Sequence, residues 1–208
     1  MNQLFVKICG MTRPQDAELA ASLGASALGF IFWPGSPRSV SAATAKAIAA
    51  SVPSNVLKVG VFVDQPAGDV ARIMDQAGID VAQLHGHESP EYCRQLMASP
   101  STRAIFKAVA PENGSVNIDE VDPEIILLVD AHDPQRYGGT GKTVNWDSAR
   151  EIAATRKTIL AGGLTAANIK LAVRTVRPYG VDVSSGVESA PGIKDPGRLR
   201  SFFEALHD

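Results

Sequence analysis

The sequence predicts a closed (β/α)8 barrel, also called a TIM barrel, and three observations support this fold class. Short runs rich in β-branched residues alternate with alanine-rich stretches of helical period along all 208 residues. These runs number eight and begin about 25 residues apart, which is room for one strand, one helix and two short loops. Repeated strand–helix units imply parallel strands, and eight units in so short a chain favour a closed barrel over the alternative, an open doubly wound sheet.

Each expected element starts at a recognisable signal. The strands begin where the β-branched runs open, near Leu4, Ala27, Leu57, Asp80, Ala104, Ile125, Lys157 and Gly180. Capping residues or prolines mark five helix starts, at Thr12 with Pro14, Ser41, Ser89 with Pro90, Asp147 and Thr165. The fifth crossover, residues 110–122, contains proline, an Asn-Gly pair and few periodic apolar positions, so we expect a single turn or irregular structure there.

Composition excludes several classes of partner. The chain has 20 Lys+Arg and 22 Asp+Glu, a net charge of -2, and no block of one sign. Nucleic acids and anionic membrane surfaces attract excess positive charge, so we expect neither as a partner. The longest apolar stretch, Ala27 to Pro34, is well short of the roughly 18 residues of a membrane-spanning helix.

The cysteines and the N-terminal residues indicate the compartment. Cys9 and Cys93 are too few for a disulfide framework, and residues 1–10 show no secretory signal. We therefore expect a cytoplasmic protein whose residues 1–208 form a single (β/α)8-barrel catalytic domain. Monomer and homodimer are both compatible with the sequence.

Two intervals between strands are longer than the others. Their extra residues, 33–39 and 131–143, follow the C-terminal ends of the second and sixth strands. Active sites of (β/α)8 barrels lie at that end, so we interpret both loops as segments that cover a substrate. An insertion without function is the alternative.

The first strand ends in a candidate nucleophile or base. Alternation places Lys7 and Cys9 on one face, with Cys9 at the C-terminal rim. An ordinary thiol is only a few per cent thiolate at neutral pH, and a nearby cation such as Lys7 would raise that fraction. A rim cysteine can also be a small apolar filler, and we interpret Cys93, within an expected helix, as a packing residue.

Polar groups end two further strands. Asp130 follows five apolar residues, and desolvation there would favour a protonated carboxyl that can act as a general acid. A helix cap or loop anchor is the alternative role. Gln83 and His85 share one face of the fourth strand, with His85 at the rim.

A metal site is a weaker interpretation of the same region. His85, His87, Asp130 and His132 have the residue types of a zinc site. Because His87 would alternate away from His85 if the strand continued, we predict no metal site.

The eighth strand is the neighbour of the first in a closed barrel. Its inward-facing residues are Asp182 and Ser184. We predict that Asp182 pairs with Lys7 inside the barrel, within about 6 Å, mainly as a structural ion pair and secondarily as an influence on Cys9.

Glycine-rich turns follow the seventh and eighth strands. Glycines let backbone N–H groups approach an anion closely, and the N-terminus of a short helix adds partial positive charge. Plain tight turns are the alternative. We predict a phosphate site formed by Gly162, Gly163, Ser184, Ser185 and Gly186.

Two loop segments carry further candidate ligands. The loop 138–142, with Gly139 and Gly141, is suited to donate to a ligand or to close over it. It resembles the end of a Walker A loop, but Arg136 stands where the first glycine is required, so we predict no nucleotide site. Arg38 offers a planar fork suited to a carboxylate or phosphate, although a lone loop arginine is usually only solvated.

Seven segments, taken together and in order, resemble the phosphoribosylanthranilate isomerase family of tryptophan biosynthesis. They span nearly the whole chain: KICGMT (7–12), GFIFWPGSPRSV (29–40), QLHG (83–86), LLVDA (127–131), GGTGKT (138–143), LAGGLT (160–165) and GVDVSSGVES with PGIKD (180–195).

The resemblance implies a metal-free and cofactor-free Amadori rearrangement of a small phosphorylated substrate. N-(5-phosphoribosyl)anthranilate would become 1-(2-carboxyphenylamino)-1-deoxyribulose 5-phosphate, with Asp130 as general acid, Cys9 as general base and Arg38 on the anthranilate carboxylate. The two glycine turns would hold the phosphate. The pocket would also be lined by Lys7, Gln83, His85, Gly139, Gly141 and Asp182.

Three other functions compete with this one. Another sugar-phosphate barrel enzyme, an epimerase or a relative of indole-glycerol-phosphate synthase, would share the phosphate turns but lack the cysteine and aspartate on the first and sixth strands. A non-enzymatic phospholigand-binding domain would need neither acid nor base. A metal-dependent hydrolase on the same barrel would need the histidine cluster.

Overall fold

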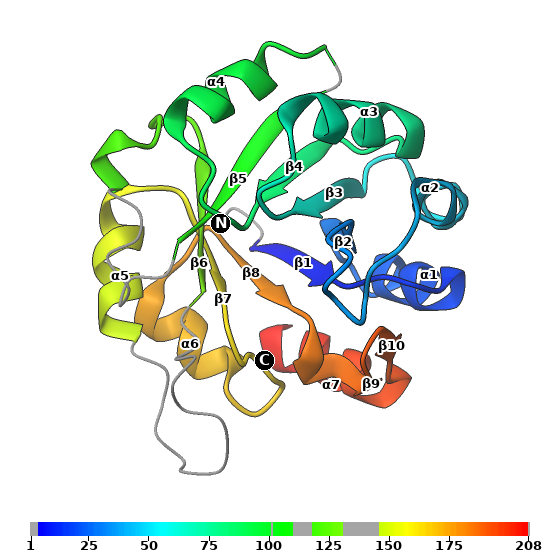
Figure 1. Ribbon diagram of the computed structural model, residues 1–208. Coiled ribbons are helices and arrows are strands. Elements are labelled where there is room, and N and C mark those ends of the chain that lie inside the picture. The colour runs from blue at the N-terminus through cyan, green and yellow to red at the C-terminus, as the bar shows by residue number, and fades with distance from the viewer. Residues whose placement is uncertain (1–3, 101, 110–117, 131–145, 208) are drawn as a thin grey trace.

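The computed structural model describes residues 4–100, 102–109, 118–130 and 146–207 (Figure 1). Eight parallel strands pair in chain order, and β1 also pairs with β8, which closes the barrel and confirms the predicted fold class. The strands are β1 (Phe5–Cys9), β2 (Ala27–Ile31), β3 (Leu57–Phe62), β4 (Val81–Leu84), β5 (Ala104–Val109), β6 (Ile126–Asp130), β7 (Thr158–Ala161) and β8 (Gly180–Val183). Each begins within one residue of its predicted start.

Helices surround the barrel. Those in the described residues are α1 (Pro14–Ser22), α2 (Ala42–Ala49), α3 (Ala67–Ala77), α4 (Pro90–Met97), α5 (Trp146–Thr155), α6 (Ile169–Val176) and α7 (Pro196–His207). Two predicted caps are confirmed, since the Ser41 and Ser89 side chains accept hydrogen bonds from the third residue after each. None of these helices is long and apolar enough to cross a membrane.

The first helix begins at Pro14, as predicted, but one predicted cap and one predicted helix start differ from the structure. Thr12 caps no helix, because its hydroxyl donates to the Gly192 carbonyl at 2.5 Å and ties β1 to the C-terminal part of the chain. The helix expected from Thr165 begins four residues later, at Ile169. Here the Asn168 side chain accepts from the Thr165 N–H and fixes a turn before the helix.

The barrel interior is filled by side chains from alternating strand positions. Small and large apolar groups pack there: Ala27, Val59, Val81, Phe106, Ala108, Leu128, Ile159 and Ala161. A larger apolar cluster lies between the strands and the helices. The filled interior leaves the C-terminal ends of the strands as the place for a site.

Two connections depart from the simple repeat. The described part of the fifth crossover is a 3-10 turn, η1 (Ile118–Glu120). After β8 the chain forms another 3-10 turn, η2 (Ser185–Val187), and then a small antiparallel pair, β9 (Glu188–Ala190) and β10 (Ile193–Lys194). This pair leads into α7 and lies near the end of β8 (Figure 1).

Candidate active site

A cavity of about 310 Å³ opens where the barrel strands end. Most of the predicted site residues line it, each from the C-terminal end of its strand or from the loop that follows. They are Cys9, Arg38, Gln83, His85, Asp130, Gly162, Gly163, Asp182, Ser184, Ser185 and Gly186. Gly139 and Gly141 lie outside the described residues. The structure thus brings together groups from six of the eight strand ends.

Lys7 was expected to line the pocket, but it is fully buried, lies beneath the cavity and pairs with Asp182. The β1–β8 register places the two residues opposite each other, and the distance from Lys7 Nζ to Asp182 Oδ1 is 2.9 Å. The predicted ion pair is therefore confirmed. Burial alone would lower the pKa of Lys7, but the charges of Asp182 and Cys9 outweigh it and the pKa is raised. Lys7 is therefore a fixed cation directly below the thiol.

The Cys9 side chain is buried at the rim, with the residue 6% exposed. Burial raises the pKa of its thiol, and the opposing effect of Lys7 does not cancel this. The expectation that a cation would increase the thiolate fraction is therefore outweighed by desolvation. Gly29 on β2 leaves space for the Cys9 and Lys7 side chains, because a Cβ at position 29 would lie 2.7 Å from Cys9 Sγ and 3.0 Å from Lys7 Nζ.

A histidine and an amide lie at the end of β4. Gln83 Nε2 and His85 Nδ1 are 3.1 Å apart, which fits an amide N–H donating to an unprotonated ring nitrogen. Burial lowers the pKa of His85, although Asp130 opposes this effect. His85 is therefore neutral near pH 7 and can serve as a hydrogen-bonding group of the pocket wall.

Asp130 is the last residue of β6 and is half-buried. The β6–β7 register pairs it with Ala161, immediately before the first glycine turn. The carboxyl thus lies at the edge of the cavity, between the apolar interior and the loops. A group there can reach both a ligand and solvent.

The two glycine turns pack against each other. Gly162 and Gly163 adopt φ values of 91° and 62°, which L side chains rarely adopt. A Cβ on Gly186 would overlap the Leu164 carbonyl, so glycine is required for the turns to approach. Ser184 Oγ is buried among them with no hydrogen-bond partner in the described structure. The two turns therefore lie side by side and both line the cavity.

Arg38 is not simply solvated. Its Nε lies 3.0 Å from both Glu188 carboxylate oxygens, and its Nη2 lies 2.6 Å from Oε2. Glu188 also accepts from Lys194 Nζ at 2.8 Å. Glu188 and Lys194 lie within the segments GVDVSSGVES and PGIKD, but the sequence predicts no role for either. The sequence feature that could have indicated a role is an acidic and a basic residue separated by a short turn, next to the predicted phosphate site.

Possible metal ligands do not converge among the described residues. No group of three or more His, Cys, Asp or Glu side chains that could hold an ion occurs in that part of the chain. His87 instead faces solvent, and its Nδ1 lies 3.1 Å from Asp64 Oδ2. His132 lies outside the described residues.

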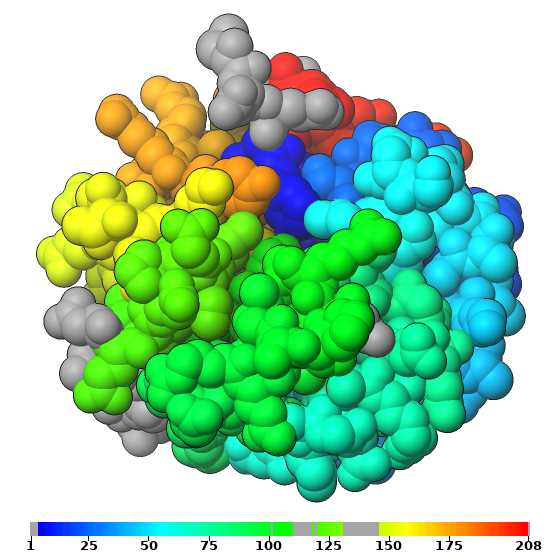
Figure 2. All heavy atoms as spheres, turned by 90° about the horizontal axis from the view of Figure 1, so that it is seen from above, coloured from blue at the N-terminus to red at the C-terminus, as the bar shows by residue number. Residues whose placement is uncertain are grey.

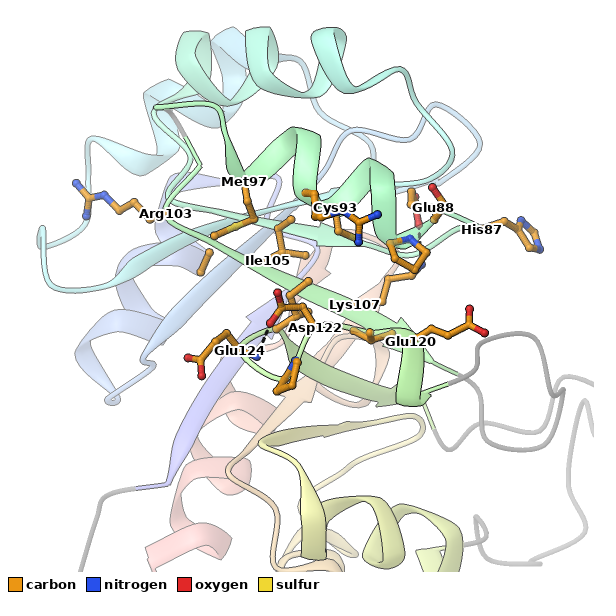
Figure 3. A pocket seen from close by; sticks show the side chains of 17 residues that line it. His87, Glu88, Cys93, Met97, Arg103, Ile105, Lys107, Glu120, Asp122 and Glu124 are labelled. Carbon is orange, nitrogen blue, oxygen red and sulfur yellow. Dashed lines mark hydrogen bonds and ion pairs between the residues drawn. The ribbon is translucent and has the colours of Figure 1, made fainter.

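A larger cavity, about 610 Å³, lies outside the barrel between α4, β5 and the segment from η1 to β6. Figure 2 views this side of the molecule, where the green α4 region borders the yellow-green start of β6. Lys107 and Glu88 lie at its inner end (Figure 3), and their 2.7 Å ion pair satisfies both charges. None of the predicted site residues lines this cavity, so we assign the active site to the smaller one.

Comparison with known proteins identifies the family. The sequence model described as "PRAI: N-(5'phosphoribosyl)anthranilate (PRA) isomerase" matches residues 6–205. The chain belongs to this family. A relative named N-(5'-phosphoribosyl)anthranilate isomerase, from Pelobacter propionicus, is 44% identical over 199 residues, which is 95% of this chain and 92% of the relative. The resemblance found in the sequence is therefore confirmed, and the chain is an isomerase of tryptophan biosynthesis.

Solved structures of the PRA isomerase family have the same architecture. Phosphoribosyl anthranilate isomerase from Thermotoga maritima aligns with a TM-score of 0.89, at 35% identity and 99% coverage of both chains. Another member, with a TM-score of 0.83 and 32% identity over 99% of both chains, was solved in complex with reduced 1-(o-carboxyphenylamino)-1-deoxyribulose 5-phosphate. Family membership favours the isomerase over the epimerase, binding-protein and hydrolase interpretations.

Proposed function

We propose that this chain converts N-(5-phosphoribosyl)anthranilate into 1-(2-carboxyphenylamino)-1-deoxyribulose 5-phosphate, with Asp130 as general acid and Cys9 as general base. The observation that carries this proposal is that one cavity holds a carboxyl, a buried thiol and two glycine turns. No metal or cofactor takes part in the proposed reaction. The expected single catalytic domain and cytoplasmic location belong to the same proposal.

The first step opens the ribose ring. Asp130 donates its proton to the ring oxygen while the bond between that oxygen and C1 breaks, and the anilino nitrogen supplies the electrons for a C1 iminium ion. The position of Asp130 at the rim of β6, half-buried, gives it contact with a bound substrate and with the solvent that reprotonates it.

The second step uses Cys9. Its sulfur removes the proton from C2, and the C2–H electrons form the enolamine and neutralise the iminium charge. The enolamine then becomes the ketone as C1 gains a proton and the C2 hydroxyl loses one. The raised pKa of Cys9 keeps the resting thiol neutral. The thiol must therefore lose its own proton to solvent before it can accept the one from C2, and the iminium charge formed in the first step, together with Lys7 below, stabilises that thiolate.

The remaining groups orient the substrate. The backbone N–H groups at Gly162, Gly163 and Gly186, with the hydroxyls of Ser184 and Ser185, hold the phosphate. The fork of Arg38 binds the anthranilate carboxylate. Gln83 and His85 form a neutral wall of the same pocket.

A fluorescence assay tests this proposal. Purified protein added to N-(5-phosphoribosyl)anthranilate, without metal or nucleotide, is expected to abolish the anthranilate fluorescence, and a chelator is expected to leave the rate unchanged. Product must be identified by mass and chromatography, since spontaneous hydrolysis of the substrate releases free anthranilate. Absence of turnover above that background would refute the proposed activity, and inhibition by the chelator would revive the metal site.

A further inference from the structure

The Arg38 guanidinium is fixed on two sides. Along its stem, a Cβ on Gly10 would lie only 2.7 Å from Arg38 Cδ, so the chain rests directly on the glycine that follows Cys9. At its head, the Nε and Nη2 edge faces the carboxylate of Glu188, at 3.0 and 2.6 Å. The Glu188 residue is 5% exposed. This loop arginine is therefore held with little freedom to turn.

Glu188 is itself held in place. Lys194 Nζ donates to Glu188 Oε1 at 2.8 Å and to the Cys9 carbonyl at 2.5 Å, and the Gly192 N–H also donates to Oε1 at 3.2 Å. Burial would raise the pKa of Glu188, but hydrogen bonds from Arg38 and Lys194 outweigh it and lower the pKa. The carboxylate is therefore ionised and tied to the backbone beside the proposed base.

Lys194 preserves the positive charge of this cluster. Burial lowers the pKa of Lys194, and Glu188 offsets this only in part. The three ammonium donors match three acceptors: Glu188, Cys9 O and Ser184 O. A lone Glu188 would neutralise Arg38. With Lys194 included, two cations face one anion, so the cluster remains attractive to a further carboxylate.

The guanidinium still has donors for that carboxylate. It has five N–H groups, and Glu188 occupies the edge formed by Nε and Nη2. The N–H groups of the other edge, formed by Nη1 and the second Nη2 hydrogen, donate to no protein acceptor among the described residues, and Arg38 lines the active-site cavity. A planar carboxylate fits this edge with two parallel hydrogen bonds.

We propose that Glu188 is the positioning residue that aims Arg38 at the substrate carboxylate and thereby sets the preference of the site for anthranilate over aniline derivatives. This inference rests on the proposed function, because it assumes that Arg38 meets that carboxylate. Glu188 acts through Arg38 and touches neither the substrate nor the reacting atoms.

Binding of two inert ligands tests the proposal. The first is reduced 1-(2-carboxyphenylamino)-1-deoxyribulose 5-phosphate, and the second is the same compound without the carboxylate. Calorimetry gives both dissociation constants. The constant of the decarboxylated ligand divided by that of the carboxylated ligand measures the carboxylate preference alone. In Glu188→Gln we expect this ratio to fall about tenfold, because the loss of the fixed orientation of Arg38 outweighs the removal of one negative charge. The decarboxylated ligand does not meet Arg38, so its binding should change little. A merely structural role would weaken both ligands alike.

Three further variants complete the experiment. Glu91→Gln is the matched control, because it breaks an exposed Glu–Arg pair, Glu91 with Arg94, far from the cavity; its ratio should equal that of the wild type. Arg38→Met should lose the preference, and adding Glu188→Gln to it should cause no further loss. If Glu188→Gln does not fold, Glu188→Asp, which retracts the carboxylate by one methylene, is expected to lower the ratio as well.

The outcomes separate the two proposals. If Arg38→Met lowers the ratio but the Glu188 variants leave it unchanged or raise it, the positioning role is wrong. If Arg38→Met itself leaves the ratio unchanged, the carboxylate contact in the proposed function is wrong, and the role of Glu188 fails with it.

Discussion

Substitution of Gly29 by alanine tests whether the position of the Cys9 sulfur controls catalysis. Gly29 lies on β2 opposite Cys9 in the β1–β2 register. An added Cβ would lie 2.7 Å from Cys9 Sγ and 3.1 Å from Cys9 Cα, while ordinary contact begins at 3.4 Å. The added Cβ would also lie 3.0 Å from Lys7 Nζ. The backbone at Gly29 is not in the left-handed region, so the effect would come from these contacts and not from backbone strain.

The size of the effect follows from the overlap. The sulfur must retreat by about 0.7 Å to reach ordinary contact, by rotation of its one side-chain bond or by movement of the backbone. A misplacement of about 1 Å in a catalytic group can lower a rate about 100-fold. We therefore expect kcat/KM of Gly29→Ala to fall about 30- to 100-fold, or about 2 to 2.7 kcal/mol of barrier. Overpacking should also lower the free energy of unfolding by about 1–3 kcal/mol.

The assay is the rate of anthranilate fluorescence loss, with urea unfolding measured in parallel. Gly68→Ala is the control, because a Cβ there would meet nothing within 4 Å and its residue lies in α3. It should retain full activity and equal or slightly higher stability. If folded Gly29→Ala turned over substrate within a factor of two of the wild-type rate, the position of the sulfur would not be critical, and Cys9 would lose its proposed role.

Three other predictions concern the same groups. Cys9→Ala and Asp130→Asn should each lower kcat by at least about 100-fold with an unchanged thermal midpoint, measured by fluorescence assay and circular dichroism; near-normal turnover in either would overturn the mechanism. Because burial raises the pKa of Cys9, alkylation of this thiol by iodoacetamide, followed by mass spectrometry, should keep accelerating above about pH 9.5, where an ordinary thiol of pKa about 8.5 has levelled off; a plateau near neutral pH would contradict the resting thiol. Lys7→Met should destabilise the fold by about 3–5 kcal/mol in urea, because it leaves buried Asp182 unpaired, and Asp182→Asn in the same chain should restore most of this loss; no restoration would argue against the ion pair.

Much of the architecture could be predicted from the sequence because strand signals are local. Apolar β-branched runs and turn residues placed all eight strand starts within one residue, and alternation then placed Lys7 and Asp182 on inward faces. Once the barrel is closed, β1 and β8 must be neighbours, so this ion pair followed from topology. The residues of the cavity followed in the same way, because they lie at strand ends.

Contacts between loops could not be predicted, because no periodicity fixes them. Arg38 and Glu188 are separated by 150 positions. Arg38 lies in a loop and Glu188 begins the short strand β9, and the course of both segments depends on tertiary packing. Thr12 was expected to cap a helix, but the Gly192 carbonyl is the acceptor that packing brings to its hydroxyl. The pKa direction of Cys9 also depends on tertiary structure, since burial competes there with a neighbouring cation.

The seam between β1 and β8 has a consequence for synthesis of the protein on the ribosome. Cys9 is among the first residues to be made, whereas its surroundings come from Asp182 and Lys194, which are translated near the end. During most of translation the thiol therefore lacks its full burial, and Lys7 beside it lacks its ion-pair partner Asp182. The proposed base acquires its chemical character only when the last strand and the following hairpin close the ring.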